Sequence, residues 1–124
     1  MSWKLDSDRP IHKQLLEVLL TGIVSGTYPS GSKLPSVRDL AMEAGVNPNT
    51  MQRAFTELEQ KGLVRTERTA GRFVTDDREK IERSRDAVAT QQLTLFLDKM
   101  QQLGFQKKEI VSFVRSKIEE GKNE

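Results

Sequence analysis

Cysteine is absent from this chain of 124 residues, and histidine occurs once, as His12. Without cysteine the chain can form no disulfide bond and offers no thiolate ligand for zinc and no cysteine nucleophile. A single histidine without cysteine cannot build an ordinary zinc site, so we interpret His12 as a surface or packing residue. These absences indicate a protein of a reducing compartment, the cytoplasm, without a structural metal.

Long apolar runs are also missing. No segment approaches the roughly 18 unbroken apolar residues of a membrane span. The first ten residues, MSWKLDSDRP, lack the apolar centre of a signal peptide. We therefore expect no membrane association. The composition, 35% hydrophobic and 31% charged, is typical of a soluble protein, and the length suits one compact domain with an accessory element.

Motifs of catalysis and cofactor binding are absent as well. The chain contains no P-loop, GxGxxG, HExxH or GxSxG pattern. The neighbouring acids Glu57 and Glu59, like Glu119 and Glu120, have no evident apolar pocket that would tune a carboxylate pair, so we interpret them as helix-surface charge. We expect no enzymatic activity and no cofactor.

Charge by itself is a weak indicator here. The net charge is +2, with ten Lys and Arg against eight Asp and Glu in residues 1–75, and ten against ten in residues 76–124. The excess lies in the first part, but it is too small to imply a nucleic-acid partner.

Three short helices are predicted in the first 61 residues. The first begins with Asp8 as its N-cap, has Pro10 in its first turn and ends by Gly26. Helical spacing is followed by the apolar residues Ile11, Leu15, Val18, Leu19 and Ile23.

The second and third helices are joined by only one glycine and one valine. Ser36 caps the second helix, VRDLAMEA, which Gly45 ends. Asn47 caps the third helix, which has Pro48 at its first position and runs to about Lys61. Such a connection makes two short helices cross steeply, as in a helix-turn-helix.

Beyond Gly62 the pattern becomes that of strands. LVRTE and RFVT are rich in Val, Thr and Phe and flank the loop RTAG. A three-helix unit followed by a hairpin is a winged helix, with the hairpin as its wing. The predicted fold class is therefore mainly α, with a winged helix-turn-helix DNA-binding domain at residues 1–75.

Residues 76–124 are predicted to form a helical dimerisation element of two helices. The first covers 28 residues without Gly or Pro, at 76–103, and the second covers 106–120. The sequence does not decide whether the first of these helices bends near Ser84 or Thr90. On a monomer their apolar side chains would form a sizeable exposed patch, which favours a homodimer. The candidate dimerisation residues are Leu93, Phe96, Leu97, Met100, Ile110, Phe113 and Val114.

The third predicted helix has two unlike faces, at about 100° per residue. The core side comprises Met51, Ala54, Phe55 and Leu58. The opposite side, which we call the polar face, comprises Asn49, Arg53, Thr56 and Gln60. These side chains match the donor and acceptor pattern of base edges in a DNA major groove. Free N–H groups at the start of this helix would also favour a phosphate. For Asn47 and Pro48, simple capping is an alternative that is compatible with DNA contact.

Other candidate contacts are cationic. Arg38 lies on the outward side of the second helix, where a helix-turn-helix crosses the DNA backbone, so we expect a phosphate contact. The alternative is a surface ion pair with Asp39 or Glu43. A phosphate-binding rim in the loop and wing would comprise Lys33, Arg65, Thr66, Arg68, Thr69 and Arg72.

The segment from Tyr28 to Val74 resembles the DNA-binding domain of the GntR family of bacterial transcription regulators. The resemblance is carried by LPSVRDLA, then GVNPNT, then Leu-Glu-Gln-Lys-Gly, in this order. The preceding DSDRPIHKQL looks like the first helix of that family and extends the match to most of residues 6–75. The two helices in the remaining 49 residues are similar to the short dimerisation element of the YtrA subfamily.

The resemblance implies a homodimer that binds double-stranded DNA and represses an operon, often one for an ABC transporter. It assigns DNA contact to Arg38 and to the start of the third helix, and it places the wing tip near the minor groove. The candidate DNA-binding residues are Lys33, Ser36, Arg38, Asn47, Pro48, Asn49, Thr50, Arg53, Arg68, Gly71 and Arg72.

The chain departs from the family pattern in its third helix, its wing and its first helix. Pro48 stands where many relatives have arginine, so base contacts would rest more on Asn49 and Arg53. The usual wing sequence GxGTFV is here TAGRFV, which loses one glycine and gains Arg72. His12 replaces a common tyrosine.

The sequence therefore predicts a sequence-specific DNA-binding regulator, a homodimeric repressor with an inverted-repeat operator. It would work in a bacterial cytoplasm, on the nucleoid when bound. The alternative is a winged-helix adaptor for other proteins that lacks sequence-specific DNA binding. The operator, the regulated genes, any small-molecule effector, and the choice between repression and activation are left open.

Overall fold

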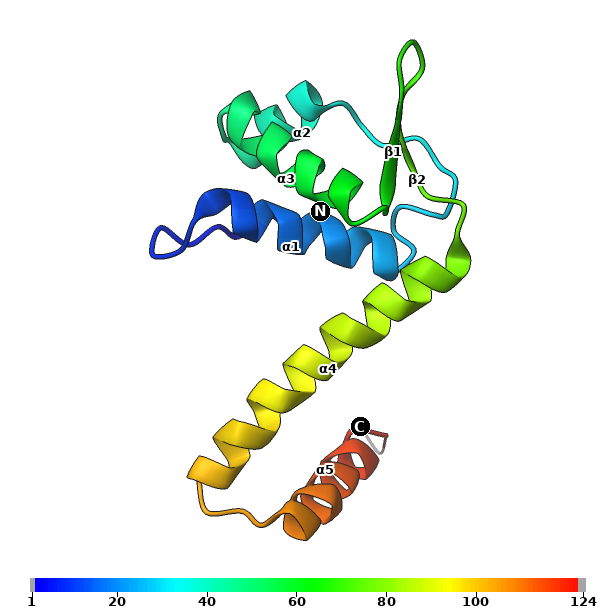
Figure 1. Cartoon of the computed structure of the whole chain (residues 1–124). Coiled ribbons are helices and arrows are strands. Elements are labelled where there is room, and N and C mark those ends of the chain that lie inside the picture. Colours follow the sequence, from blue (N-terminus) through cyan, green and yellow to red (C-terminus); the bar gives the residue numbers. More distant parts are fainter. Residues whose placement is uncertain (1, 123–124) are drawn as a thin grey trace. The chain divides into compact units, whose positions relative to one another are not determined.

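The computed structural model of the protein describes residues 2–122, and in that range it contains five α-helices and one antiparallel pair of β-strands (Figure 1). The chain divides within a helix into two compact units, one ending at Arg85 and the other beginning at Asp86. The elements are α1 (Ile11–Val24), α2 (Val37–Ala44), α3 (Pro48–Gln60), β1 (Val64–Glu67), β2 (Gly71–Val74), α4 (Arg78–Gln102) and α5 (Lys107–Lys122). The predicted fold class is confirmed.

The caps of α2 and α3 are those that the sequence predicts. Ser36 Oγ accepts a hydrogen bond from the Asp39 N–H at 3.0 Å, and Asn47 Oδ1 accepts one from the Asn49 N–H at 2.8 Å. Gly45 ends α2 with φ 70°, a left-handed conformation that costs other residues energy. These local signals set the two helices of the helix-turn-helix.

The predicted start of α1 is wrong. Pro10 takes the N-cap position, and the Asp8 N–H instead donates to Asp6 Oδ1 at 3.0 Å in the preceding turn. The cause is Gln14, whose buried side chain accepts from the Asp6 N–H at 2.6 Å and donates to the Arg9 carbonyl at 2.9 Å. This clamp holds residues 6–9 outside the helix.

The core of the first unit lies between α1, α2, α3 and the start of the hairpin. Helix α3 is central, because it packs against α1, α2 and β1. The buried cluster comprises Leu15, Leu19, Ile23, Leu34, Leu40, Ala41, Met51, Ala54, Phe55, Leu58, Leu63, Val64 and Val74. The predicted core side of α3 is thus confirmed, and its opposite side is left for solvent.

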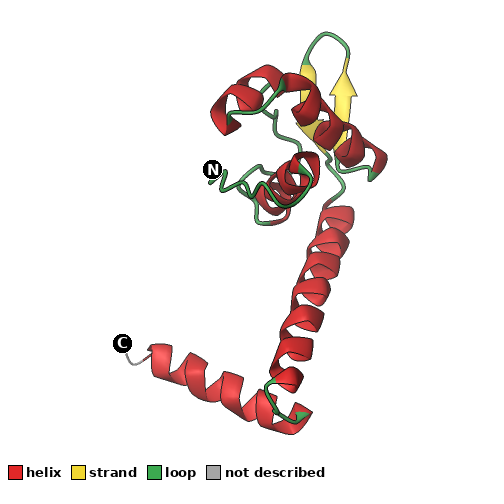
Figure 2. Ribbon diagram, turned by 90° about the vertical axis from the view of Figure 1, so that its left-hand side faces the viewer, coloured by secondary structure: helices red, strands yellow, loops and turns green. Residues whose placement is uncertain are grey.

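The wing is the hairpin of β1 and β2, paired from Val64 with Val74 to Glu67 with Gly71. Its loop, residues 68–70, projects beyond the helices (Figure 2). As the chain leaves β2, the Thr75 N–H donates to the Leu63 carbonyl at 2.9 Å. The hairpin base is thereby attached to the segment that follows α3.

The loop before α2 also pairs with the wing, which the sequence did not predict. Lys33 forms a β-bridge with Phe73, and the Leu34 N–H donates to the Arg72 carbonyl at 2.8 Å. Residues 31–34 therefore run along β2 and join it through an isolated β-bridge and backbone hydrogen bonds. This pairing joins positions about 40 residues apart, so no local pattern reveals it.

Helix α4 is unbroken over its length, with no interruption at Ser84 or Thr90. Ile81 in its second turn packs against the core of the first unit. After Gly104, with φ 97°, the chain continues into α5. Within residues 2–122, none of the helices combines the length and the apolar character that a membrane span requires.

Replacement of Phe55 tests the central place of α3. Its side chain is fully buried, so Phe55→Ala should lower the free energy of unfolding by about 3–5 kcal/mol through lost burial and a cavity. Urea denaturation followed by circular dichroism measures this. Gln60→Ala, on the exposed side of the same helix, is the control and should stay within about 0.5 kcal/mol of the parent. Equal stability of the two variants would contradict the core assignment.

Candidate nucleic-acid interface

The polar face of α3 is exposed along the whole helix. Asn49, Arg53, Thr56 and Gln60 are all exposed, whereas the four core residues of the same helix are buried. Asn49 and Arg53 lie one turn apart and have no side-chain hydrogen bond or ion pair within residues 2–122. Their donors and acceptors are therefore available to a partner.

The backbone at the start of α3 is already hydrogen-bonded. Pro48 has no N–H, and the Asn49 N–H donates to the side chain of Asn47. The N–H groups of Thr50 and Met51 both donate to the Asn47 carbonyl, at 3.0 and 3.2 Å. The expectation of free N–H groups for a phosphate is therefore wrong at this helix, because the cap and the proline use or remove them.

The start of α2 is more open. Ser36 accepts from the N–H groups of Asp39 and Leu40, while the first two N–H groups of the helix have no acceptor within the described residues. Helix geometry leaves such groups without an internal partner, and the helix dipole adds partial positive charge. The alternative interpretation of Arg38 as an ion-pair partner of Asp39 finds no support, because its exposed guanidinium forms no ion pair or hydrogen bond within residues 2–122.

His12 lies beside the polar face, although its sequence context indicated only a surface or packing role. A shallow notch of about 250 Å³ is lined by His12, Gln52, Arg53, Thr56, Glu57 and Gln60. The notch brings a residue of α1 next to the polar side of α3. The sequence carried no signal for this, since 41 positions separate His12 from Arg53.

The cations of the loop and wing fall into two groups. Lys33 and Arg68 are exposed without an ion-pair partner in the described part of the chain, and Lys33 lies against the wing, where a Cβ on Gly71 would come within 3.0 Å of its Cε. Arg65, by contrast, pairs with Glu67 and, at 3.7 Å, with Asp76. Its charge is therefore largely balanced within the wing.

Arg72 belongs to the paired group. Its Nε donates to Glu59 Oε1 at 3.3 Å and its terminal nitrogen donates to Gln52 Oε1 at 3.2 Å. The Thr66 hydroxyl donates to the same Glu59 oxygen at 2.9 Å. Glu59, interpreted from the sequence as surface charge, thus connects α3 to both strands of the wing.

Two further observations limit the chemistry of this surface. Within residues 2–122, His, Asp and Glu side chains form no group of three that could hold a metal ion. Burial raises the pKa of Tyr28 above its ordinary value of 10.0, and the negative charge of Glu43 raises it further. Tyr28 is therefore neutral at physiological pH and adds no charge near α2.

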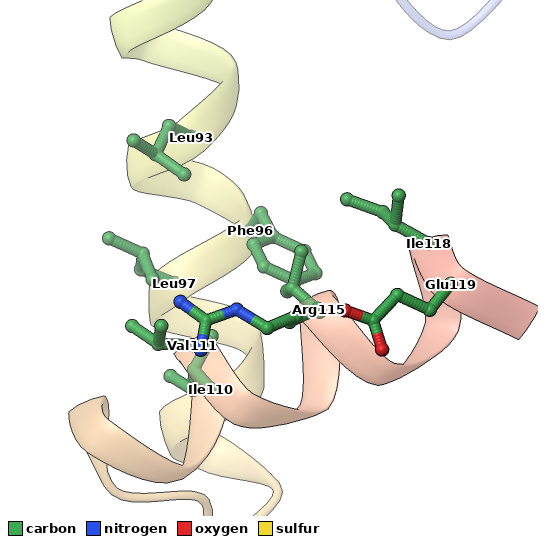
Figure 3. A pocket seen from close by; sticks show the side chains of 9 residues that line it. Leu93, Phe96, Leu97, Ile110, Val111, Arg115, Ile118 and Glu119 are labelled. Atoms are coloured by element: carbon green, nitrogen blue, oxygen red, sulfur yellow. The ribbon is translucent and has the colours of Figure 1, made fainter.

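In the second unit, the predicted dimerisation residues gather around two adjoining apolar hollows. The larger, of about 660 Å³, is lined from α4 and α5 by Leu93, Phe96, Leu97, Ile110, Val111, Val114, Arg115, Ile118 and Glu119 (Figure 3). The smaller, of about 510 Å³, shares Phe96 and includes Met100 and Phe113. Ile110 is only 3% exposed, whereas Phe96 is 40% exposed.

The chain is similar to known proteins in both sequence and structure. The sequence pattern of bacterial regulatory proteins of the gntR family matches residues 11–74. The chain is 33% identical over 121 residues to the uncharacterized HTH-type transcriptional regulator YhcF of Bacillus subtilis, which covers 98% of this chain and 100% of YhcF. It is 37% identical over 71 residues to the HTH-type transcriptional repressor YtrA of Bacillus subtilis, covering 57% of this chain and 55% of YtrA.

Solved structures of the same fold include two that bear on the interface. A GntR family transcriptional regulator from Listeria monocytogenes is 40% identical, with a TM-score of 0.85 over 90% of this chain and 98% of that one. AraR(DBD) in complex with operator ORX1 is 25% identical, with a TM-score of 0.52 over 60% of this chain and 92% of that one.

These relatives are described as transcription regulators, and they share the winged helix-turn-helix whose geometry is given above. The family pattern spans α1 to the end of β2, and YhcF matches along its entire length. The protein therefore belongs to the GntR family of bacterial transcription regulators, among YtrA-like relatives.

Proposed function

We propose that this protein is a homodimeric repressor that binds an inverted-repeat operator, in the cytoplasm of a bacterium. The observation that carries the proposal is the polar face of α3, exposed opposite a fully buried side. Support also comes from the AraR domain, which is in complex with an operator, and from YtrA, which is named a repressor. From the resemblance to the YtrA subfamily we further expect that the regulated operon encodes a transporter.

Base contacts are proposed for the polar face in the major groove. Arg53 can donate two hydrogen bonds to O6 and N7 of guanine, and Asn49 can pair with N6 and N7 of adenine. Asn47 caps α3 and Pro48 begins it, and we expect Asn49 and Thr50 of this first turn to contact the DNA. Because the backbone N–H groups there are used, side chains supply the contacts.

Phosphate contacts are proposed on either side of α3. At the start of α2, the backbone beside Ser36 and the side chain of Arg38 would bind one strand of the DNA backbone. In the wing, Lys33 and Arg68 supply unpaired charge. Gly71 leaves room for Lys33 beside the hairpin, since a larger residue would crowd it.

A second copy of this chain is proposed to cover the apolar hollows of α4 and α5. Phe96 lies in both hollows, and several apolar side chains around it are more than half exposed, namely Leu93, Val111 and Ile118. Water contact with such a surface is unfavourable by about 25 cal/mol per Å² of apolar area. In a twofold dimer the two DNA-binding heads would face half-sites in opposite orientation.

The decisive experiment selects DNA sequences. Purified protein is incubated with a random double-stranded library at about 0.15 M salt, close to physiological ionic strength, and the retained DNA is sequenced. We expect an inverted repeat to be enriched, because two related heads contact two half-sites. Retention without a consensus, or no retention, would reject the sequence-specific repressor in favour of an adaptor.

Two arginine variants should affect DNA binding in different ways. Arg53→Ala should weaken operator binding by about 1–3 kcal/mol and relax the preference at one base position. Arg38→Ala should weaken binding to all sequences and lower the slope of log K against log salt by about 0.9, because one phosphate contact is lost. Fluorescence anisotropy titrations at several salt concentrations measure both. Parental behaviour of both variants would refute the contact assignment.

The dimer interface is tested by placing a charge at position 96, which lines both hollows. The parent should have twice the chain mass of 14.1 kDa by light scattering at micromolar concentration. Phe96→Asp should shift it toward the monomer, because burial of an unpaired carboxylate is costly. The matched control is Gln91→Asp, at an exposed position of α4 outside both hollows. A monomeric parent would contradict the proposed dimer.

A further inference from the structure

We propose that Arg72 is a positioning residue that holds the wing against α3 and keeps Gln52 away from the DNA bases; this inference rests on the proposed DNA-binding function. The sequence placed Arg72 among the direct DNA contacts. Its surroundings in the structure support a different role. Its side chain is only 27% exposed, and it lies over α3.

The guanidinium of Arg72 is engaged on several sides. Its Nε donates to Glu59 Oε1 at 3.3 Å, and a terminal nitrogen donates to Gln52 Oε1 at 3.2 Å. Its central carbon lies 5.5 Å from the centre of the Phe55 ring. A guanidinium that is paired with a carboxylate and placed over an aromatic ring neutralises little phosphate charge.

Glu59 makes the wing orientation depend on α3. One carboxylate oxygen accepts from Thr66 in β1 at 2.9 Å and from Arg72 in β2 at 3.3 Å. Each strand has only four residues. Residues 31–34 attach to β2, whereas Glu59 contacts both strands at the Thr66–Arg72 pair, next to the pair of Glu67 and Gly71 at the tip. The junction at Glu59 therefore sets where the unpaired Arg68 of the loop stands relative to the polar face.

Gln52 is the side chain whose DNA contact this junction prevents. It lies between Asn49 and Arg53 in sequence, beside the polar face, and glutamine can pair with both N6 and N7 of adenine. Here its Oε1 is held by Arg72, and its Nε2 donates to the Thr56 hydroxyl at 3.3 Å. Arg72 thereby restricts base recognition to the other side chains of α3, which makes it a determinant of specificity.

The first test uses the free protein. In ¹⁵N NMR spectra, the Nε–H signal of Arg72 should be shifted and slow to exchange, and Glu59→Gln should move it toward the position of the solvent-exposed Arg68 signal. Arg68 is the matched reference because it belongs to the same wing and has no partner within residues 2–122. If the parental Arg72 signal coincides with that of Arg68, the inference is overturned.

The second test uses the selected operator. Arg72→Ala should bind it about tenfold more weakly, a loss of one or two hydrogen bonds, with an unchanged salt slope. Arg68→Ala should lower the slope by about 0.9, as expected for one lost phosphate contact. Library selection with Arg72→Ala should yield an altered base preference, and the added change Gln52→Ala should abolish that alteration. Glu59→Gln, which preserves the size of the side chain, should reproduce the effect of Arg72→Ala in a milder form.

The outcomes separate this inference from the proposed function. If the parent selects no consensus, the DNA-binding proposal fails and the inference fails with it. If the parent selects an operator but Arg72→Ala lowers the salt slope as Arg68→Ala does, or keeps the parental consensus, only the inference fails. An unchanged slope together with an altered consensus supports both.

Discussion

The burial of one side of α3 is the constraint on which the rest of the DNA-binding unit depends. Met51 and Phe55 are fully buried among side chains of α1, α2 and the hairpin base. Because side chains three or four positions apart share a side of a helix, burial of this side turns Asn49 and Arg53 outward. The proposed contacts to bases are thus a consequence of core packing, and the helix cannot rotate without exposing its apolar residues.

The acidic side chains around α3 determine which arginines are paired within the protein and which can contact a partner molecule. Arg38, Arg53 and Arg68 have no acidic partner within residues 2–122, and their charge can act on a partner molecule. Arg65 and Arg72 are paired inside the wing and with α3. A net charge near zero is therefore compatible with a strongly polarised surface, since the paired arginines organise the wing while the unpaired ones remain for phosphate.

The second unit has a different physical character. Apart from Ile110, the described apolar side chains of this unit remain partly or fully exposed. The hollows around Phe96 are lined by α4 and α5 and are open to solvent. A surface of this kind is costly in water, and a twofold dimer offers a way to cover it without a second protein. Dimerisation and DNA recognition would then be linked through the continuous helix α4, whose Ile81 packs against the core of the first unit.

Local chemistry explains what the sequence by itself determined. Ser36, Asn47 and Gly45 act through neighbouring backbone groups, and the faces of α3 follow from helical period, so the helix-turn-helix, the wing and the polar face could be predicted. Tertiary structure decided the rest, because the partners are distant in sequence. Gln14 displaced the start of α1, residues 31–34 joined β2, and Glu59 was drawn into the wing by Arg72. Hydrogen bonds and ion pairs need two groups within a few ångströms, and only the folded chain brings these groups together.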